Sequence, residues 1–129
     1  MTISQKLAGL DVLLVEDDYY LADDTKRVLT AAGANVAGPY ARVAESLSRV
    51  AQGRVDCGVL DINLGEGPSF LTARALRQRD VPFVFVTGYG REILPDDFGD
   101  VELLEKPVDA RALIDAVVRA CRKPGAPGI

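Results

Sequence analysis

Three carboxylates stand directly behind two short apolar runs of this sequence. Glu16 and Asp17 follow the run 12–15, and Asp61 follows the run 59–60. An acid just past an apolar run is expected at the carboxyl end of a buried strand, and the carboxyl ends of parallel strands meet at one edge of a sheet. Clustered carboxylates repel one another, so such a site calls for a compensating cation. A set of oxygen ligands favours a hard divalent ion such as Mg²⁺.

Two further predicted strands bring a hydroxyl and a lysine to the same edge. Thr87 follows the run 82–86, and Lys106 comes just after the run 101–104. Acids with a bound Mg²⁺ can accept a phosphoryl group on one carboxylate. A lysine adds a positive charge beside the phosphoryl oxygens, and a threonine hydroxyl can donate a hydrogen bond to them. The predicted chemistry is therefore phosphoryl acceptance on an acid.

The elements that must position these residues alternate along the chain. Asp18 and Asp109 are predicted to cap two helices at their amino ends, and Pro68 is predicted to lie in the first turn of a third. Five strand–helix units imply a parallel sheet with helices on both faces. We expect strands over 11–15, 35–38, 55–60, 82–86 and 101–104, and helices over 19–32, 41–52, 68–78 and 110–122.

The segment 88–99 should hold a fourth helix but has the wrong composition for one. It contains Gly88, Gly90, Pro95 and Gly99, which leaves only about 89–94 for helical structure. A short or mobile element is expected there.

The length and composition of the chain limit the class of protein. A chain of 129 residues with a net charge of −4 fits one domain, and its scattered basic residues give no nucleic-acid or membrane-surface footprint. No histidine is present, which excludes imidazole metal sites and histidine acid–base catalysis. Cys57 and Cys121 lack metal-site spacing and are expected as free buried thiols. No run reaches the length of a membrane span, so we expect a cytoplasmic protein.

The order and spacing of these residues resemble those of the CheY-like receiver domains of two-component response regulators. The resemblance covers about 10–122, with a flexible tail over 123–129, and treats 1–129 as a single receiver domain. It implies a five-stranded parallel sheet of flavodoxin-like order 2-1-3-4-5. It also implies a bound Mg²⁺ and a Lys106–Pro107 bond that is often cis.

The resemblance assigns a role to each matching residue. Asp61 matches the phosphoacceptor, and Thr87 and Lys106 match the switch hydroxyl and the phosphate-binding lysine. By the same resemblance, Asp61 and Asp17 would bind the metal directly. Glu16 would usually act through water, and Asn63 would bind through its backbone carbonyl.

Two departures from the family pattern affect switching. Gly65 stands where the family usually has proline, and Leu103 stands where it usually has the aromatic partner of the threonine. Ordering of the segment 88–99 is therefore our preferred switch.

The run 82–90 resembles that of the "FATGUY" receivers of α-proteobacteria, which work with histidine kinases of the HWE/HisKA2 kind. Tyr89 in that run would cover the phosphoryl site or report its state.

The predicted function is that of a stand-alone receiver. It would take a phosphoryl group from a histidine kinase onto Asp61 and signal by protein contact, or act as a phosphorelay intermediate or phosphate sink. It would be a monomer or weak dimer with an unknown downstream protein, and no enzyme beyond catalysing its own phosphorylation and dephosphorylation.

Several other interpretations stay open at this point. The domain could be a pseudo-receiver that binds partners without phosphorylation. A dehalogenase-type phosphatase is disfavoured because Asn63 replaces its second acid, and a flavodoxin-like cofactor binder is disfavoured because acids would repel its phosphate. Glu16 and Asp17 could serve only as helix-terminal acids, and Tyr19 and Tyr20 are interpreted as helix packing and surface residues.

Overall fold

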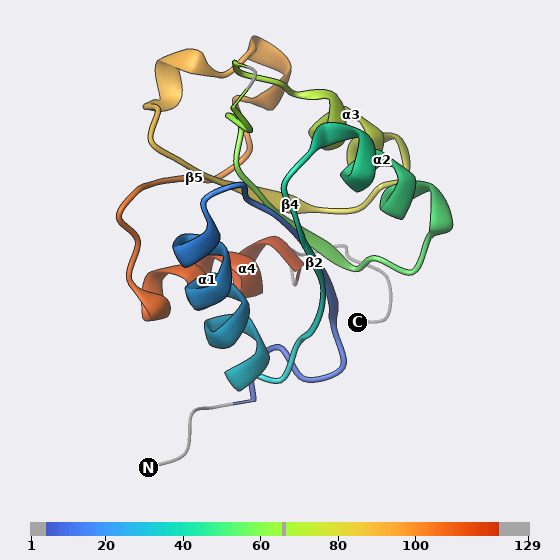
Figure 1. Ribbon diagram of the computed structural model, residues 1–129, viewed down its shortest axis with the longest axis vertical. Helices are drawn as coiled ribbons and strands as arrows, with labels where there is room; N and C mark the ends of the chain where they lie inside the picture. The colour runs from blue at the N-terminus through green and yellow to red at the C-terminus, as the bar shows by residue number, and fades with distance from the viewer. Residues whose placement is uncertain (1–4, 66, 122–129) are drawn as a thin grey trace.

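A five-stranded parallel sheet forms the centre of the molecule in the computed structural model, which describes residues 5–65 and 67–121. The strand order is β2-β1-β3-β4-β5, as predicted, and every pairing is parallel (Figure 1). The strands are β1 (Asp11–Val15), β2 (Asn35–Tyr40), β3 (Cys57–Leu60), β4 (Phe83–Thr87) and β5 (Leu103–Glu105).

Helices cover both faces of the sheet (Figure 1). The helices are α1 (Tyr19–Ala31), α2 (Val43–Gln52), α3 (Leu71–Gln78) and α4 (Ala110–Cys121). The caps predicted from the sequence are present. Asp18 accepts a hydrogen bond from the Leu21 N–H at 3.1 Å, and Asp109 accepts one from the Ala112 N–H at 2.8 Å.

Alternation along the strands divides the core into two layers. Val12 and Leu14 pack toward α1 and α4, whereas Leu13 and Val15 pack toward α2 and α3. Successive side chains of a strand point to opposite faces, so an unbroken apolar run marks a strand that is covered on both sides. β1 and β3 are such strands, and they end beside each other with Val15 opposite Leu60.

The connection from β4 to β5 contains no α-helix. Two short 3₁₀ turns, η1 (Arg91–Ile93) and η2 (Asp96–Phe98), take its place. The glycines and Pro95 that predicted a short element interrupt the ladder of backbone hydrogen bonds that a longer helix requires. The prediction of a short element is therefore confirmed.

Two expectations about individual segments were wrong. Pro68 does not open α3. It pairs with Asn63 in an isolated antiparallel bridge, and the Ser69 N–H donates to the Ile62 carbonyl at 2.9 Å, so the chain turns before the helix starts at Leu71. Val101 lies before β5, because its N–H bonds the Phe98 carbonyl of the preceding turn.

Other outcomes concern side chains and the ends of the chain. Tyr19 and Tyr20, interpreted as helix packing and surface residues, lie on the surface and are 77% and 80% exposed. Cys57 is buried and Cys121 is half-buried, and both are free thiols. Arg122 and the tail 123–129 lie outside the described residues. Within the described ranges, no helix is long and apolar enough to span a membrane.

Candidate phosphoryl-acceptor site

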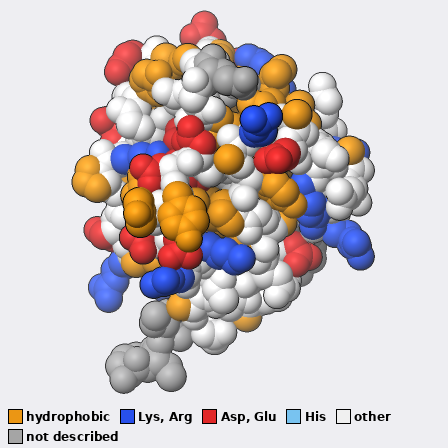
Figure 2. Space-filling model, in the orientation of Figure 1, with side chains coloured by type: hydrophobic (Ala, Val, Ile, Leu, Met, Phe, Trp, Pro, Cys, Tyr) orange, Lys and Arg blue, Asp and Glu red, His pale blue; other side chains and the backbone are white. Residues whose placement is uncertain are grey.

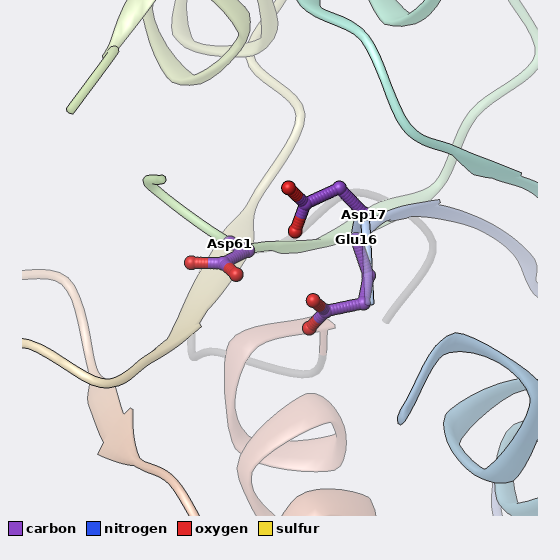
Figure 3. A group of neighbouring side chains, drawn as sticks. All are labelled: Glu16, Asp17 and Asp61. Carbon is purple, nitrogen blue, oxygen red and sulfur yellow. The ribbon is translucent and has the colours of Figure 1, made fainter. Parts of the chain in front are cut away.

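The three predicted carboxylates meet at the carboxyl edge of the sheet. Glu16, Asp17 and Asp61 each offer an oxygen within 4.8 Å of the others, and Figure 3 shows the three side chains close together. Glu16 is 5% exposed and Asp61 is 9% exposed, whereas Asp17 faces solvent. Two nearly buried acids side by side require a positive charge close to them.

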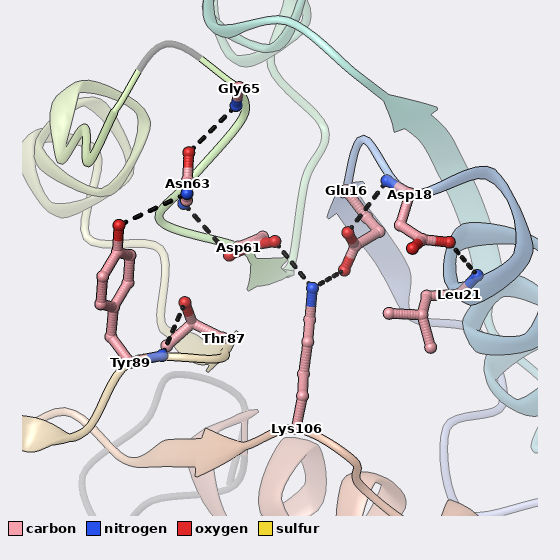
Figure 4. Close-up of polar contacts among 9 residues, drawn as sticks. All are labelled: Glu16, Asp18, Leu21, Asp61, Asn63, Gly65, Thr87, Tyr89 and Lys106. Atoms are coloured by element: carbon pink, nitrogen blue, oxygen red, sulfur yellow. Dashed lines mark hydrogen bonds and ion pairs between the residues drawn. The ribbon is translucent and has the colours of Figure 1, made fainter.

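Lys106 supplies that charge in this structure. Its Nζ lies 2.8 Å from Glu16 Oε1 and 2.8 Å from Asp61 Oδ2 (Figure 4). The lysine comes from the loop that follows β5, and its peptide bond to Pro107 is cis. The ion pair therefore joins residues from three strand ends.

Backbone N–H groups hold the remaining oxygens of these two acids. The Asp18 N–H donates to Glu16 Oε2 at 3.1 Å, and the Asn63 N–H donates to Asp61 Oδ1 at 3.1 Å. Each carboxylate thus has one oxygen on the lysine and one on the backbone, which fixes its orientation. Asp17 makes no such contact with any part of the chain that the structure describes, so its oxygens are available to a ligand.

The burial and the charges shift two pKa values. Burial raises the pKa of Glu16, and the nearby charge of Asp61 raises it further, although the hydrogen bonds from Lys106 and Asp18 oppose the shift. Burial alone would lower the pKa of Lys106, but its hydrogen bonds to Asp61 and Glu16 outweigh that effect and raise it. The lysine is therefore held in its charged form beside the acids.

The other side of the site is formed by longer polar contacts. Thr87 is fully buried at the end of β4, and its Oγ1 accepts from the Tyr89 N–H at 3.5 Å. The Tyr89 hydroxyl accepts from Asn63 Nδ2 at 3.4 Å, and Asn63 Oδ1 accepts from the Gly65 N–H at 3.0 Å (Figure 4). These contacts link the loop after β3 to the loop after β4.

All six residues named from the sequence line one open pocket. Five further residues line it that had no role in the sequence argument or only a minor one. These are Asp18, Leu21, Gly65 and Gly88, together with Tyr89, which the sequence had pointed to as a possible cover. The position of Gly65 in the loop after Asp61 is the feature of the sequence that could have indicated it as a pocket residue. A Cβ there would lie 3.4 Å from Asp17 Oδ2, so glycine leaves space beside that acid.

The first turn of α1 borders this pocket with exposed apolar side chains. Tyr19 and Tyr20 contact each other edge to face with ring centroids 5.4 Å apart. Figure 2 shows apolar side chains over this part of the molecule with acidic side chains around them. Leu103, which stands at the family's aromatic position, is partly buried against the apolar layer under α2 and α3.

A comparison with protein families decides the class of this arrangement. The family model described as the response regulator receiver domain matches residues 12–118. The chain belongs to the response regulator receiver family. No curated protein matches the chain.

Solved structures are similar to this chain in fold, and two of them also in sequence. SdrG from Pseudomonas melonis Fr1, in a BeF3-activated conformation, is 33% identical over 88% of this chain and 98% of its own, with a TM-score of 0.74. A response regulator receiver protein from Sinorhizobium medicae is 27% identical over 88% of this chain and 95% of its own, with a TM-score of 0.75. The receiver domain of PhyR from Erythrobacter litoralis shares the fold, with a TM-score of 0.79 at 24% identity over 95% of this chain and 97% of its own.

Proposed function

We propose that this receiver takes a phosphoryl group from the phosphohistidine of a histidine kinase onto Asp61, in a reaction that depends on Mg²⁺. The observation that carries the proposal is the position of Lys106, 2.8 Å from both Asp61 and Glu16. A cation at that point compensates the charge of two nearly buried carboxylates, and the carboxylate of Asp61 is the nucleophile that the reaction needs.

The residues present suit a magnesium ion. Their oxygens lie within 4.8 Å of one another, Asp17 is exposed, and Gly65 leaves space beside it. Asp17, Asp61 and the backbone carbonyl of Asn63 would hold the ion, with Glu16 acting through water. When bound, the ion neutralises the oxygens of the donor and the product.

The protein's own residues would align and stabilise the transfer. A carboxylate oxygen of Asp61 attacks the phosphorus and the phosphorus–nitrogen bond to the histidine breaks. The imidazole, which already carries a proton on its other ring nitrogen, leaves as the neutral ring. Lys106 stays beside the transferred group and balances part of its charge. Thr87 lies at the end of the neighbouring strand, where its hydroxyl would donate to a phosphoryl oxygen.

The product would carry more negative charge than the free acid. The phosphorylated side chain would carry roughly −1.5 to −2 charges at pH 7, where the free carboxylate carries one. That charge would draw Lys106 and Thr87 inward and reorganise the nearby part of the β4–β5 connection, and the phosphorylated surface would contact a downstream protein in the cytoplasm or pass the group on.

Intact-mass measurement after incubation with acetyl phosphate tests the proposal. We expect one added phosphoryl group with Mg²⁺ and none with EDTA. Asp61→Asn should abolish the addition, whereas Asp24→Asn, the same change at an exposed acid on α1, should leave it unchanged. Labelling that survives in Asp61→Asn would move the acceptor elsewhere.

If acetyl phosphate adds no phosphoryl group, the next experiment is a titration of the protein with Mg²⁺ and beryllofluoride. Absence of binding to both would favour a pseudo-receiver that acts without phosphorylation.

A further inference from the structure

The two cysteines lie at the end of the molecule opposite the acidic site. Cys57 opens β3, whose other end leads to Asp61, and Cys121 closes α4. Helix α4 packs on β3 and β4, so its last turn comes to the amino end of the sheet. Both residues belong to the apolar layer between the sheet and the pair α1 and α4. The fold thus brings together two thiols that are far apart in sequence.

The thiols are near enough to affect each other. The pKa of Cys57 lies well above its usual value. The largest cause is a hydrogen bond with the side chain of Cys121, and burial is the second. Cys57 is 0% exposed, whereas Cys121 is half-buried. Cys57 therefore keeps its proton, and solvent reaches the pair at Cys121.

We propose that Cys57 and Cys121 form a peroxide-sensitive pair that closes to an intramolecular disulfide. The Cys121 sulfur attacks the peroxide, the oxygen–oxygen bond breaks, and a sulfenic acid and water form. The Cys57 sulfur then displaces the hydroxyl group from the Cys121 sulfur, and the proton of Cys57 leaves with it as a second water. The peroxide is reduced and the two thiols are oxidised, so the balance is complete.

The disulfide would tie the last turn of α4 to the strand that carries Asp61. Asp61, Lys106 and the rest of the acidic site lie at the other end of the strands and take no part in the reaction. The inference therefore stands whether or not Asp61 accepts a phosphoryl group.

Mass spectrometry of the whole, folded chain tests this pair. The reduced protein is treated with hydrogen peroxide, and the remaining thiols are alkylated without reductant. We expect a loss of two hydrogen atoms, no alkylation at either cysteine, a linked pair of peptides and full reversal by reductant. Cys121→Ser and Cys57→Ala should each abolish the linked product, while Asp61→Asn should form it as the wild type does.

Three results would overturn the proposal. One is oxygen addition at Cys121 with Cys57 still free to be alkylated after unfolding. Another is a disulfide between two copies of the chain. The third is both thiols remaining reduced under conditions that oxidise a small thiol added to the same solution. Circular dichroism of the two variants verifies that they are folded, so a lost linkage reports the missing sulfur.

Discussion

The connection between β4 and β5 has two halves that are held very differently. The first half, 88–94, borders the acidic site, and its polar contacts there are the 3.4 Å and 3.5 Å hydrogen bonds of Tyr89. The second half, 95–102, contains Phe98, which is 0% exposed and packs against Phe70, Phe83 and Phe85 with centroids 5.7–5.8 Å apart.

Arginines from α3 fasten the second half further. Arg74 pairs with Asp97, and Arg77 donates to the Asp97 carbonyl and lies 3.2 Å from Asp100. Both guanidinium groups lie over the Phe98 ring, 4.9 Å from its centroid. Such a ring combines apolar burial with attraction to a cation on its face.

The difference narrows the switching hypothesis. The sequence indicated that the whole segment 88–99 could become ordered on phosphorylation, but its second half is already anchored. Movement that starts at the site is expected in 88–94, next to Thr87. Arg91 connects the two halves, because its guanidinium donates to the Gly99 and Val101 carbonyls at 2.7 Å and 2.9 Å.

The largest expected effect comes from removing the buried ring. Phe98→Ala should lower the free energy of unfolding by about 3–5 kcal/mol, since it opens a cavity in the middle of the aromatic cluster. Urea denaturation followed by circular dichroism measures the change. Tyr89→Phe is the control in the first half and should change stability by no more than about 0.5 kcal/mol. Equal losses in the two variants would mean that the two halves are held alike.

A smaller loss is expected from one of the arginines. Arg77→Met should cost about 1–2 kcal/mol, because it removes the contacts to Phe98 and Asp97 while the exposed ion pair with Asp100 adds little. Arg79→Met, near the same helix end, loses only a 3.5 Å contact to the Ala51 carbonyl and serves as the matched control. A neutral result for Arg77→Met in the same urea assay would show that Arg77 does not stabilise the second half.

The acidic site should respond to pH in a way that the aromatic cluster does not. The pKa of Lys106 is raised in the folded state, so its stabilising contribution is complete below the ordinary value of 10.5 and is lost as the pH rises through the raised pKa. The wild type should therefore lose more stability than Lys106→Met as the pH is raised above 10.5. Identical losses in the two proteins would show that the ion pair contributes nothing to folding.

The smallest effect is a local one on hydrogen exchange. Binding of beryllofluoride with Mg²⁺ should change amide protection in 88–94 and leave 96–101 unchanged, because the second half is fixed by contacts away from the site. Hydrogen exchange with mass spectrometry resolves the two stretches. A change of equal size in both would show that the anchor at Phe98 moves with the site.

Local patterns in the sequence were sufficient for the frame and for most of the site. Apolar runs ending in Glu16, Asp61 and Thr87 predicted strands and the edge where they meet, and Asp18 predicted the start of α1. Such signals lie within a few residues of one another, so they can be recognised without knowledge of the fold.

Contacts between distant segments were beyond those patterns. Nothing near Arg74 or Arg77 in sequence indicates Phe98, and nothing near Cys57 indicates Cys121. Pro68 was misplaced because proline suits both a first helical turn and an extended bridge, and the choice depends on the pairing with Asn63 across the loop. These features are set by how helices pack on the sheet, which local composition does not encode.

The pairing of Val15 with Leu60 has a consequence for how the protein tolerates insertions and deletions. One residue gained or lost inside β1 would shift Glu16 and Asp17 relative to Asp61 and would also turn each side chain of the strand toward the opposite apolar layer. The same error would thus misalign the acids and disrupt both layers of the core. Length variants of β1 should consequently fail to fold instead of accumulating as folded, inactive proteins, and length variation should be confined to the loops away from the acidic edge.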